Sequence, residues 1–512
     1  MAACGSGGDG EKGDDSIVVS APLLPSSLDY PFEGTSSIYA TEGFMSTLVD
    51  FGPQPEGEKT LNTTDVIPSL AESWETTPEG QVFTLRDATA PSGNKLTPED
   101  VVYTYERLIG IEDGIASFLM GLAGIDTSNP VTVLDEHRVR LNGNIAPLGH
   151  LGWQFLRFSI LDSKLVKEHA TKDDPWANKW LSTNTATFGA YSASHFEPNK
   201  QLVLKANPHY WGGTLPYQQV TVLARAQGSS ATQLLDSGTV HWATRVSSSD
   251  LKSAKTNGNL KTTISPQLTQ DVLALNQAYK PFADVKVRQA MSLATDRKSL
   301  LEGAYGGLGD VARTVGSRAI PAVSKVEGEL FDFDLDRAKQ LMAESSYPDG
   351  FTFEMAYLPS QSAGGDLEVV AVALQKFYAE LGIKLVPKPV TDFAQFDEGQ
   401  RSKKYQAFYW GEGPILADGA YAMNLWHVAE GGANYTGEAD PDVTALIKDA
   451  MGQPLGDQRD HLVAEAADIW NSKMYSLPMI DTAGAYIAHK DVCGFGTYPY
   501  QNVLYKDLKP CS

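Results

Sequence analysis

The sequence predicts an α/β fold, and three observations support that class. Short β-branched runs such as residues 17–20, and short apolar runs such as 201–205, favour strands. Segments with apolar residues at helical spacing, such as 457–470, favour amphipathic helices. The two kinds of segment alternate along the chain, which is typical of α/β proteins. At 512 residues the chain is too long for one hydrophobic core, so we expect two or three domains.

Local signals predict the elements in chain order. A helix start is predicted at Thr97, which would be the N-cap, with Pro98 in the first turn and two acids after it. Such residues stabilise the N-terminus of a helix. Gly382 is expected to cap the end of a helix that is followed by a strand. The predicted strands are 17–20, 72–75, 82–85, 132–134, 139–141, 201–205, 220–224 and 383–386. The predicted helices are 36–48, 101–108, 285–294, 336–344, 367–381 and 457–470.

Composition excludes several classes of protein. Hydrophobic residues make up 42% of the chain and charged residues 20%, which excludes a wholly disordered chain. No run of about 18 apolar residues occurs, so no membrane-spanning helix is predicted. Lys and Arg number 41 against 63 Asp and Glu, a net charge of −22 that argues against binding nucleic acid. We expect a soluble monomer whose charge slightly favours cationic or neutral small ligands.

The N-terminal residues resemble the processed end of an exported lipoprotein. Leu-Ala-Ala-Cys-Gly is the pattern at the cleavage point of a bacterial lipoprotein signal, and Met1 here takes the place of the Leu before Cys4. Residues 1–15 are rich in Gly, Ser and Asp and are expected to form a flexible tether. Cys4 is the predicted lipidation site, so a lipid anchor would be the only contact with the membrane. The alternative is a disordered tail with an incidental thiol.

The other two cysteines lie near the C-terminus. Cys493 and Cys511 are a candidate disulfide that would close a short loop in an exported protein, and two buried free thiols are the alternative. No Cys-x-x-Cys pair or Cys/His cluster indicates zinc.

No motif of catalysis or of cofactor binding is convincing. Residues 5–10 match G-x-G-x-x-G but precede the first predicted strand, whereas a dinucleotide site follows one. Residues 332–336 hint at a calcium loop, but Arg337 stands where that loop needs Gly. None of the nine histidines has metal-ligand spacing. We therefore predict no metal, no cofactor and no catalytic residue. An enzyme stays open as an alternative, because catalytic triads meet in space and leave no spacing to find.

One segment has the composition of a small-molecule pocket. Residues 408–421 read Phe-Tyr-Trp-Gly-Glu-Gly-Pro-Ile-Leu-Ala-Asp-Gly-Ala-Tyr, and Trp426 follows. A predicted strand rich in aromatic residues opens a Gly-rich loop that carries two acids. Aromatic rings offer rigid contact area and acids orient a ligand, so we predict that this segment lines a pocket. The alternative is a core strand edge followed by a solvated loop.

Five motifs in order resemble those of a known family. Residues 67–75 are similar to P-x-L-A-x-S/K-W-E and 96–103 to L-T-A-E-D-V-V. Residues 207–212 are similar to N-P-x-Y-W-G and 338–351 to A-K-x-L-L-x-E-A-G-Y-P-D-G-F. The strongest match is 275–290, close to N-x-x-x-P-F-x-D-V-x-V-R-Q-A. On these motifs the chain resembles the peptide- and nickel-binding type of solute-binding protein, the family of dipeptide- and oligopeptide-binding proteins that serve ATP-driven (ABC) importers.

The resemblance implies a two-lobed periplasmic-binding-protein fold with three domains, the first of them discontinuous. Residues 184–191 depart from the family's N-P-V-G-T-G-P-Y, so the entry to the hinge is expected to differ. The expected order is tether 1–15, domain I 16–50, domain II 51–187, domain I again 188–270, domain III 271–484 and domain I once more 485–512.

The resemblance also implies function and site. The chain would capture a small polar solute between its lobes outside the cytoplasm and deliver it to an ABC permease. An extracellular hydrolase on the same frame is the alternative class, and an oligosaccharide, a nickel chelate or a peptide-like compound is an alternative ligand. The expected ligand-binding residues are Ser20, Ala21, Asn276, Tyr357, Ser362, Tyr409, Trp410, Glu412, Asp418, Tyr421 and Trp426.

Two of these residues carry an expectation about ligand charge. Asp418 stands in the loop where dipeptide-binding relatives hold the ammonium of the ligand, although an Asp in a Gly-rich loop is also a common turn residue. Ser362 stands where those relatives have an Arg for the carboxylate, and a serine cannot neutralise a buried charge. The expected ligand is an amine-bearing or neutral molecule without an obligatory carboxylate.

Overall fold

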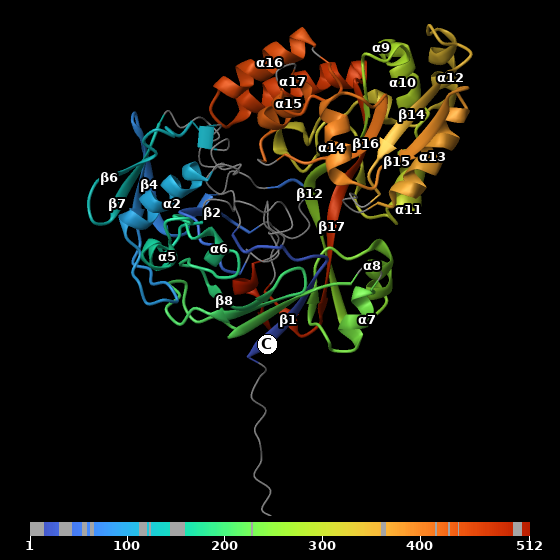
Figure 1. Ribbon diagram of the computed structural model, residues 1–512. Helices are drawn as coiled ribbons and strands as arrows, with labels where there is room; N and C mark the ends of the chain where they lie inside the picture. The colour runs from blue at the N-terminus through green and yellow to red at the C-terminus, as the bar shows by residue number, and fades with distance from the viewer. Residues whose placement is uncertain are drawn as a thin grey trace, which may run out of the picture.

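The computed structural model has two lobes (Figure 1). The first lobe lies below and to the left in that view, and the second lies above and to the right. The structure describes residues 15–29, 43–53, 59–61, 66–111, 120–121, 124–143, 159–226, 229–359, 365–414, 417–428, 431–438, 440–494 and 504–511.

One mixed sheet runs through both lobes. Its strand order is β15-β14-β16-β12-β17-β11-β1-β10-β9-β8, and β13 pairs with β17 beside this path. The strands are β1 (Ser16–Ala21), β8 (Tyr191–Glu197), β9 (Gln201–Ala206), β10 (Gln219–Ala224), β11 (Trp242–Ala243), β12 (Leu260–Leu275), β13 (Asp310–Val311), β14 (Thr352–Tyr357), β15 (Lys384–Pro389), β16 (Ala407–Glu412) and β17 (Ser476–His489).

Strands β12 and β17 connect the two lobes. They pair antiparallel from Leu260 opposite His489 to Ala274 opposite Ser476. In the first lobe β17 pairs with β11, and in the second lobe β12 pairs with β16. The register of the β12–β17 pair breaks between Pro266 and Gln270, and such irregularities bend a strand and increase its twist. The lobes therefore share a bent, two-stranded ribbon.

A separate four-stranded sheet forms the far part of the first lobe. Its order is β4-β5-β7-β6, with bounds β4 (Ala71–Thr77), β5 (Gly80–Leu85), β6 (Val131–Val133) and β7 (Arg138–Asn142). Helix α2 (Pro98–Gly110) packs on it through Val101, Tyr105 and Leu108. The Asp100 carboxylate accepts a hydrogen bond from the backbone N–H of Thr97 (2.8 Å), which fixes the helix start. The pair β2 (Val49–Phe51) and β3 (Val66–Pro68) lies beside this sheet in the same core.

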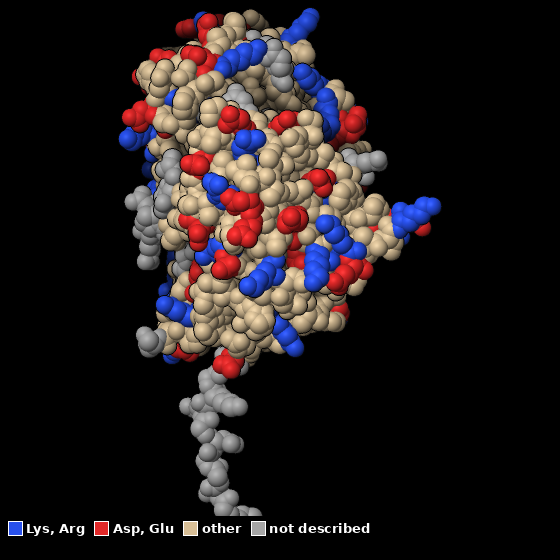
Figure 2. All heavy atoms as spheres, turned by 90° about the vertical axis from the view of Figure 1, so that its left-hand side faces the viewer, with Lys and Arg blue, Asp and Glu red and all other residues tan. Residues whose placement is uncertain are grey.

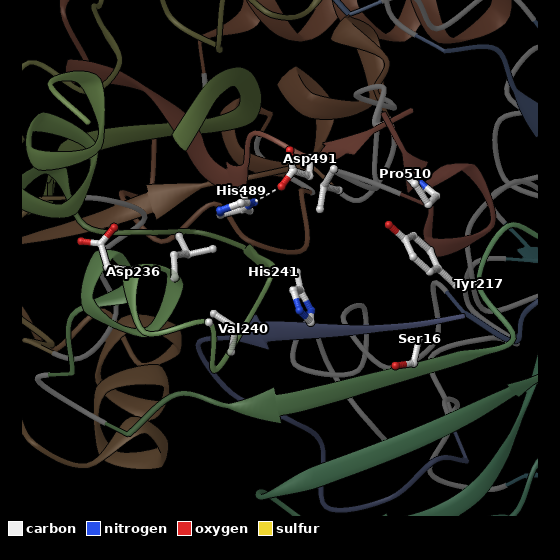
Figure 3. Close-up of a pocket in the computed structure, with 11 residues that line it drawn as sticks. Ser16, Tyr217, Asp236, Val240, His241, His489, Asp491 and Pro510 are labelled. Carbon is white, nitrogen blue, oxygen red and sulfur yellow. Dashed lines mark ion pairs between the residues drawn. The ribbon is translucent and has the colours of Figure 1, made fainter. Parts of the chain in front are cut away.

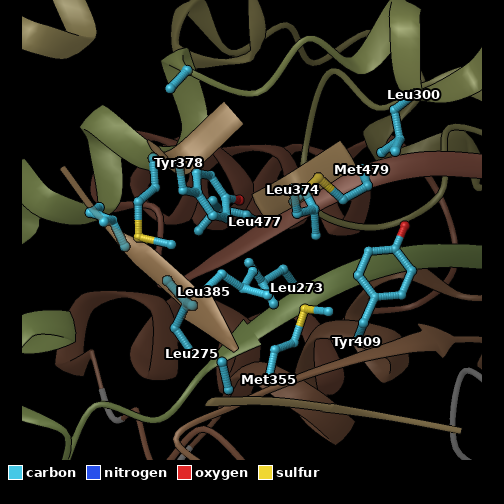
Figure 4. Close-up of a cluster of buried hydrophobic side chains, with 14 of the residues drawn as sticks. Leu273, Leu275, Leu300, Met355, Leu374, Tyr378, Leu385, Tyr409, Leu477 and Met479 are labelled. Carbon is cyan, nitrogen blue, oxygen red and sulfur yellow. The ribbon is translucent and has the colours of Figure 1, made fainter. Parts of the chain in front are cut away.

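The second lobe packs helices on both faces of its sheet. On one face, Leu273 of β12, Leu477 of β17 and Tyr378 of α13 point into one cluster (Figure 4). On the other face, α15, α16 and α17 surround a second cluster that contains Trp426 and Trp470. The helices of this lobe are α9 (Lys280–Ala283), α10 (Val285–Leu293), α11 (Arg297–Ala304), α12 (Leu335–Ala343), α13 (Leu367–Ala379), α14 (Phe393–Arg401), α15 (Gly419–His427), α16 (Pro441–Gly452) and α17 (Asp457–Lys473).

The remaining α-helices and strands belong to the first lobe. Its other helices are α5 (Ser163–His169), α6 (Asn178–Leu181), α7 (Ala231–Asp236) and α8 (Ser248–Lys255). Near the C-terminus, β18 (Val492–Cys493) pairs with β19 (Lys509–Pro510). Cys493 and Cys511 form a disulfide, rather than two free thiols.

The predicted α/β class and all eight predicted strands are confirmed. Five of the six predicted helices are also present. The helix predicted at 36–48 is wrong for its described part, because 43–48 contains a turn, a bend and residues without regular structure. Its apolar spacing has another cause: Phe44 is buried in one core cluster and Leu48 in another. The separate cores of the two sheets agree with a division into domains, but the domain boundaries stay predictions.

Candidate ligand-binding site

Three parallel strands of the first lobe end side by side at one edge of the sheet. Strand β1 pairs in parallel with β10 and with β11, and the carboxyl ends of such strands are where α/β proteins bind ligands. Ser20 and Ala21, at the end of β1, are both buried. The Arg225 guanidinium donates to the Ser20 hydroxyl (3.3 Å) and to the carbonyls of Thr244 (3.2 Å) and Arg245 (2.9 Å). It therefore joins the ends of all three strands.

Sequence reasoning missed Arg225 and Arg245. Both follow a strand closely, so a pairing of the three strands would have brought them to one edge. Arg245 has a φ of 40°, a left-handed conformation that costs a non-glycine residue energy. This local strain lies at the edge where a ligand is expected.

Trp410 lies at the centre of an aromatic group on β16. Its ring is tilted against Tyr435 (5.4 Å between centroids) and makes edge contacts with Phe408 (5.7 Å) and Trp426 (6.5 Å). The residue is partly exposed, and its buried Nε1 makes no hydrogen bond of acceptable geometry. Trp410 thus offers ring area at its exposed part, while its buried indole N–H faces the Glu412 carboxyl. Trp426 is buried at 8% exposure and supports that ring.

Tyr409 points the other way, into the core. Neighbouring residues of a strand face opposite sides, and Tyr409 is 1% exposed. Its hydroxyl lies 2.9 Å from that of Tyr305, which donates to Asp271 Oδ2 at 2.5 Å. Burial raises the pKa of Asp271 to about 7, partly offset by the Tyr305 hydrogen bond. Tyr409 therefore has no surface for direct ligand contact here, and its expected role is not supported.

Glu412 and His427 form a buried pair without charge at neutral pH. His427 Nε2 lies 3.6 Å from the Glu412 carboxylate. Burial raises the pKa of Glu412 to about 8, against a smaller opposing effect of the Trp410 indole. Burial lowers the pKa of His427 to about 3. A protonated acid therefore faces a neutral imidazole, and this end of β16 presents no net charge.

Asp418 forms a buried ion pair with an arginine of the protein. Arg459 of α17 donates to both of its carboxylate oxygens, at 2.7 and 2.9 Å, and both side chains are buried. Asp418 also caps α15 by accepting from the backbone N–H of Tyr421 (2.7 Å). The expected role as an ammonium anchor conflicts with this geometry, because the charge is neutralised and the carboxylate fixes the junction of two helices.

Asn276 likewise has a structural role. Its Nδ2 donates to the carbonyls of Lys403 (3.0 Å) and Tyr405 (3.1 Å), and its Oδ1 accepts from the N–H of Ala278. These contacts join the turn after β12 to the segment that precedes β16, and the ligand-binding role of Asn276 stays a prediction.

The other expected site residues differ in position. Tyr357 ends β14 at 5% exposure in the core cluster of the sheet. Tyr421 is 2% exposed, and its hydroxyl is buried without a hydrogen-bond partner. Cys4 and Ser362 lie outside the described residues. Within the part of the chain that the structure describes, no group of three His, Cys, Asp or Glu side chains could hold a metal ion. In that same part, no helix is long and apolar enough to cross a membrane.

A cavity of about 390 Å³ lies at the opposite end of β1. Ser16, His241, His489 and Tyr217 are among the residues that line it (Figure 3). His489 Nδ1 is 3.1 Å from an Asp491 carboxylate oxygen. The cavity lies at the amino end of β1, where Ser16 begins the strand, and not at the carboxyl edge near Ser20. It is therefore separate from the candidate site.

The face of the molecule over the four-stranded sheet carries both charge signs. Figure 2 shows Lys and Arg interspersed with Asp and Glu on this face. Proteins that bind nucleic acids gather positive charge on one surface, so this face does not have their character.

The fold and the strand-end site define a two-lobed solute-binding protein of the periplasmic type. The family model of bacterial extracellular solute-binding proteins, family 5, matches residues 65–434. The chain belongs to this family, whose members are the solute-binding components of ABC importers. It therefore binds a solute outside the cytoplasm for import.

Similar proteins cover nearly the whole chain. Heme-binding protein A of Haemophilus influenzae is 23% identical over 91% of this chain and 87% of that protein. A probable D,D-dipeptide-binding periplasmic protein of Escherichia coli is 26% identical over 89% of this chain and 83% of that protein. Among solved structures, HbpA2 from Haemophilus parasuis has a TM-score of 0.81 at 20% identity, covering 97% of this chain and all of that one. The Helicobacter pylori protein DppA in complex with the peptide STSA has a TM-score of 0.78 at 18% identity, covering 97% and 98%.

Proposed function

We propose that the solute is a small, neutral polar molecule with a flat face that stacks on Trp410. The observation that carries this proposal is the lack of charge around that ring. Asp418 is neutralised by Arg459, and Glu412 and His427 are both uncharged at neutral pH. A ligand ammonium would find no free carboxylate there, whereas a ring or planar amide would find the exposed aromatic surface of Trp410. The surroundings of Trp410 therefore favour a group of the ligand without charge at that ring.

Lobe closure is the proposed binding step. A ligand that contacts both the strand ends of the first lobe and Trp410 in the second binds only the closed form, and so stabilises it. No bond of the ligand is broken. The protein acts as a monomer, and lipid on Cys4 keeps it at the outer face of the cell membrane near its permease.

The test begins with identification of the ligand. Native mass spectrometry of the purified protein measures the mass of any co-purified molecule, and calorimetry then measures its affinity. Trp410→Ala is expected to weaken binding at least tenfold, because it removes the stacking surface. Trp74→Ala is the matched control, since Trp74 is also partly exposed but lies on β4 of the separate sheet.

Three outcomes would contradict parts of this proposal. Trp410→Ala binding as tightly as the wild type would exclude stacking. Tight binding of free dipeptides, lost when their carboxyl end is amidated, would exclude a neutral ligand. Recovery of a chemically altered ligand after incubation would favour the enzyme alternative. For the anchor, Cys4→Ser is expected to move the protein from the membrane fraction to the soluble fraction.

A further inference from the structure

Residues 59–61 lie between two strands of the first lobe in the chain, but their described contacts are with the second lobe. They lie in the connection between β2 and β3, which pair with each other in the first lobe. Leu61 is 1% exposed and packs into the cluster around α15, α16 and α17 of the second lobe. Its backbone N–H donates to the carbonyl of Ala319 at 2.7 Å. Lys59 Nζ lies 2.9 Å from a carboxylate oxygen of Asp310 on β13.

These contacts are unequal in strength. The side chains of Lys59 and Asp310 are 78% and 56% exposed, and ion pairs in water contribute little. Leu61 is buried, and removing a buried leucine side chain is among the most costly changes in a protein. Moving the lobes apart would carry Leu61 away from Ala319 and expose it to water. The leucine is therefore the main obstacle to opening at this point.

The same cluster supports the proposed ligand wall. Leu61 shares it with Trp426, and Trp410 packs against it. Contact of residues 59–61 and contact of the ligand would thus stabilise the same arrangement of the second lobe. In the proposed mechanism both contacts require the lobes to be together.

We propose that residues 59–61 form a latch that holds the lobes together before any ligand binds. A contact that exists only in the closed form shifts the population toward that form, whatever its chemical nature. The latch would raise ligand affinity because part of the closure has already taken place, and it would slow ligand entry because the open form is rarer. The inference rests on the proposed function only in taking lobe closure as the binding step.

The test measures lobe opening in ligand-free protein. The full chain is stripped of bound molecules by unfolding in guanidinium chloride and refolding with its disulfide intact. Dyes are placed on Glu136→Cys in the first lobe and Lys376→Cys in the second, in a Cys4→Ser background. Single-molecule energy transfer then gives the fraction of open molecules. This readout needs neither ligand nor permease, so it is independent of whether the proposed ligand is correct.

Leu61→Ala is expected to raise the open-to-closed ratio about tenfold, and Leu61→Met, which keeps the side chain apolar and of similar volume, should leave it nearly unchanged. Leu215→Ala is the matched control, because Leu215 is 6% exposed in a core of the first lobe alone. It should lower stability without opening the lobes. An unchanged ratio in Leu61→Ala, or equal opening in Leu215→Ala, would overturn the latch.

A second pair of variants tests the latch should Leu61→Ala fail to fold. Lys59→Ala and Asp310→Ala are both at exposed positions and should each raise the open fraction slightly, by the same amount. The double variant should open no further than either single variant, since each removes the same ion pair. Additive effects of the two single variants would contradict an ion pair between the lobes at this point.

Discussion

Replacing Asp271 with asparagine should make the protein more stable at pH 8 and less stable at pH 4.5. The Asp271 pKa of about 7 lies above its ordinary value of 3.8 because the carboxyl is buried. Between about pH 4 and pH 7 the folded chain keeps a proton on Asp271 that the unfolded chain has released. Folding therefore binds protons, and the wild type loses stability as pH rises from about 4 to 7.

The size of the effect follows from two opposing contributions. A pKa difference of about 3 corresponds to at most about 4 kcal/mol of lost stability above pH 7, at about 1.4 kcal/mol per pH unit. The asparagine introduced by Asp271→Asn would avoid this loss and could still accept the Tyr305 hydrogen bond through its carbonyl oxygen. Its buried amide hydrogens would cost about 1–3 kcal/mol at every pH. We expect a net gain of about 1–3 kcal/mol at pH 8 and a net loss below about pH 5.

Urea unfolding followed by tryptophan fluorescence at pH 4.5, 6 and 8 measures this crossing. Asp173→Asn, at an exposed position, is the control for the same chemical change and should show no crossing. A variant that is less stable than the wild type by the same amount at all three pH values would refute the reasoning, because Asp271 would then carry no pH-dependent cost.

Three further changes test other features. Arg459→Met leaves the buried Asp418 carboxylate without its cation and should cost about 3–5 kcal/mol in urea unfolding, while adding Asp418→Asn should recover part of the loss. Replacing both Cys493 and Cys511 with serine opens a loop with a sequence separation of 18 and should cost about 3 kcal/mol, seen as a lower Tm that reductant no longer changes. Asn276→Ala should lower the urea midpoint and leave ligand affinity by calorimetry unchanged, because all its described hydrogen bonds hold a turn; a selective loss of affinity would contradict this.

Local signals predicted elements well where they act within one segment. The helix at Pro98–Gly110 has its cap, its proline and its apolar face in consecutive residues, and it is present as expected. The segment 36–48 has helical spacing as well, but its described apolar residues are divided between two cores. Spacing alone cannot distinguish one apolar face from two separate burial sites.

The site was less predictable, because its chemistry depends on partners distant in sequence. From the sequence, Asp418 resembles a ligand anchor, because nothing nearby in the chain pairs with it. In the structure Arg459, 41 residues later, neutralises its charge. The opposite orientations of Tyr409 and Trp410 could have been predicted, since neighbours in a strand alternate. The place of Arg225 in the site depends on the pairing of β1 with β10 and β11, which the sequence alone does not give.

The position of β17 in the sheet has a consequence for biosynthesis. This strand, Ser476–His489, lies between β11 and β12 and is nearly the last part of the chain to be made. Until it emerges, the sheet of the first lobe and that of the second lack their shared central strand, and contacts between segments so far apart in sequence form late. A nascent chain thus cannot complete either lobe before its synthesis is almost finished.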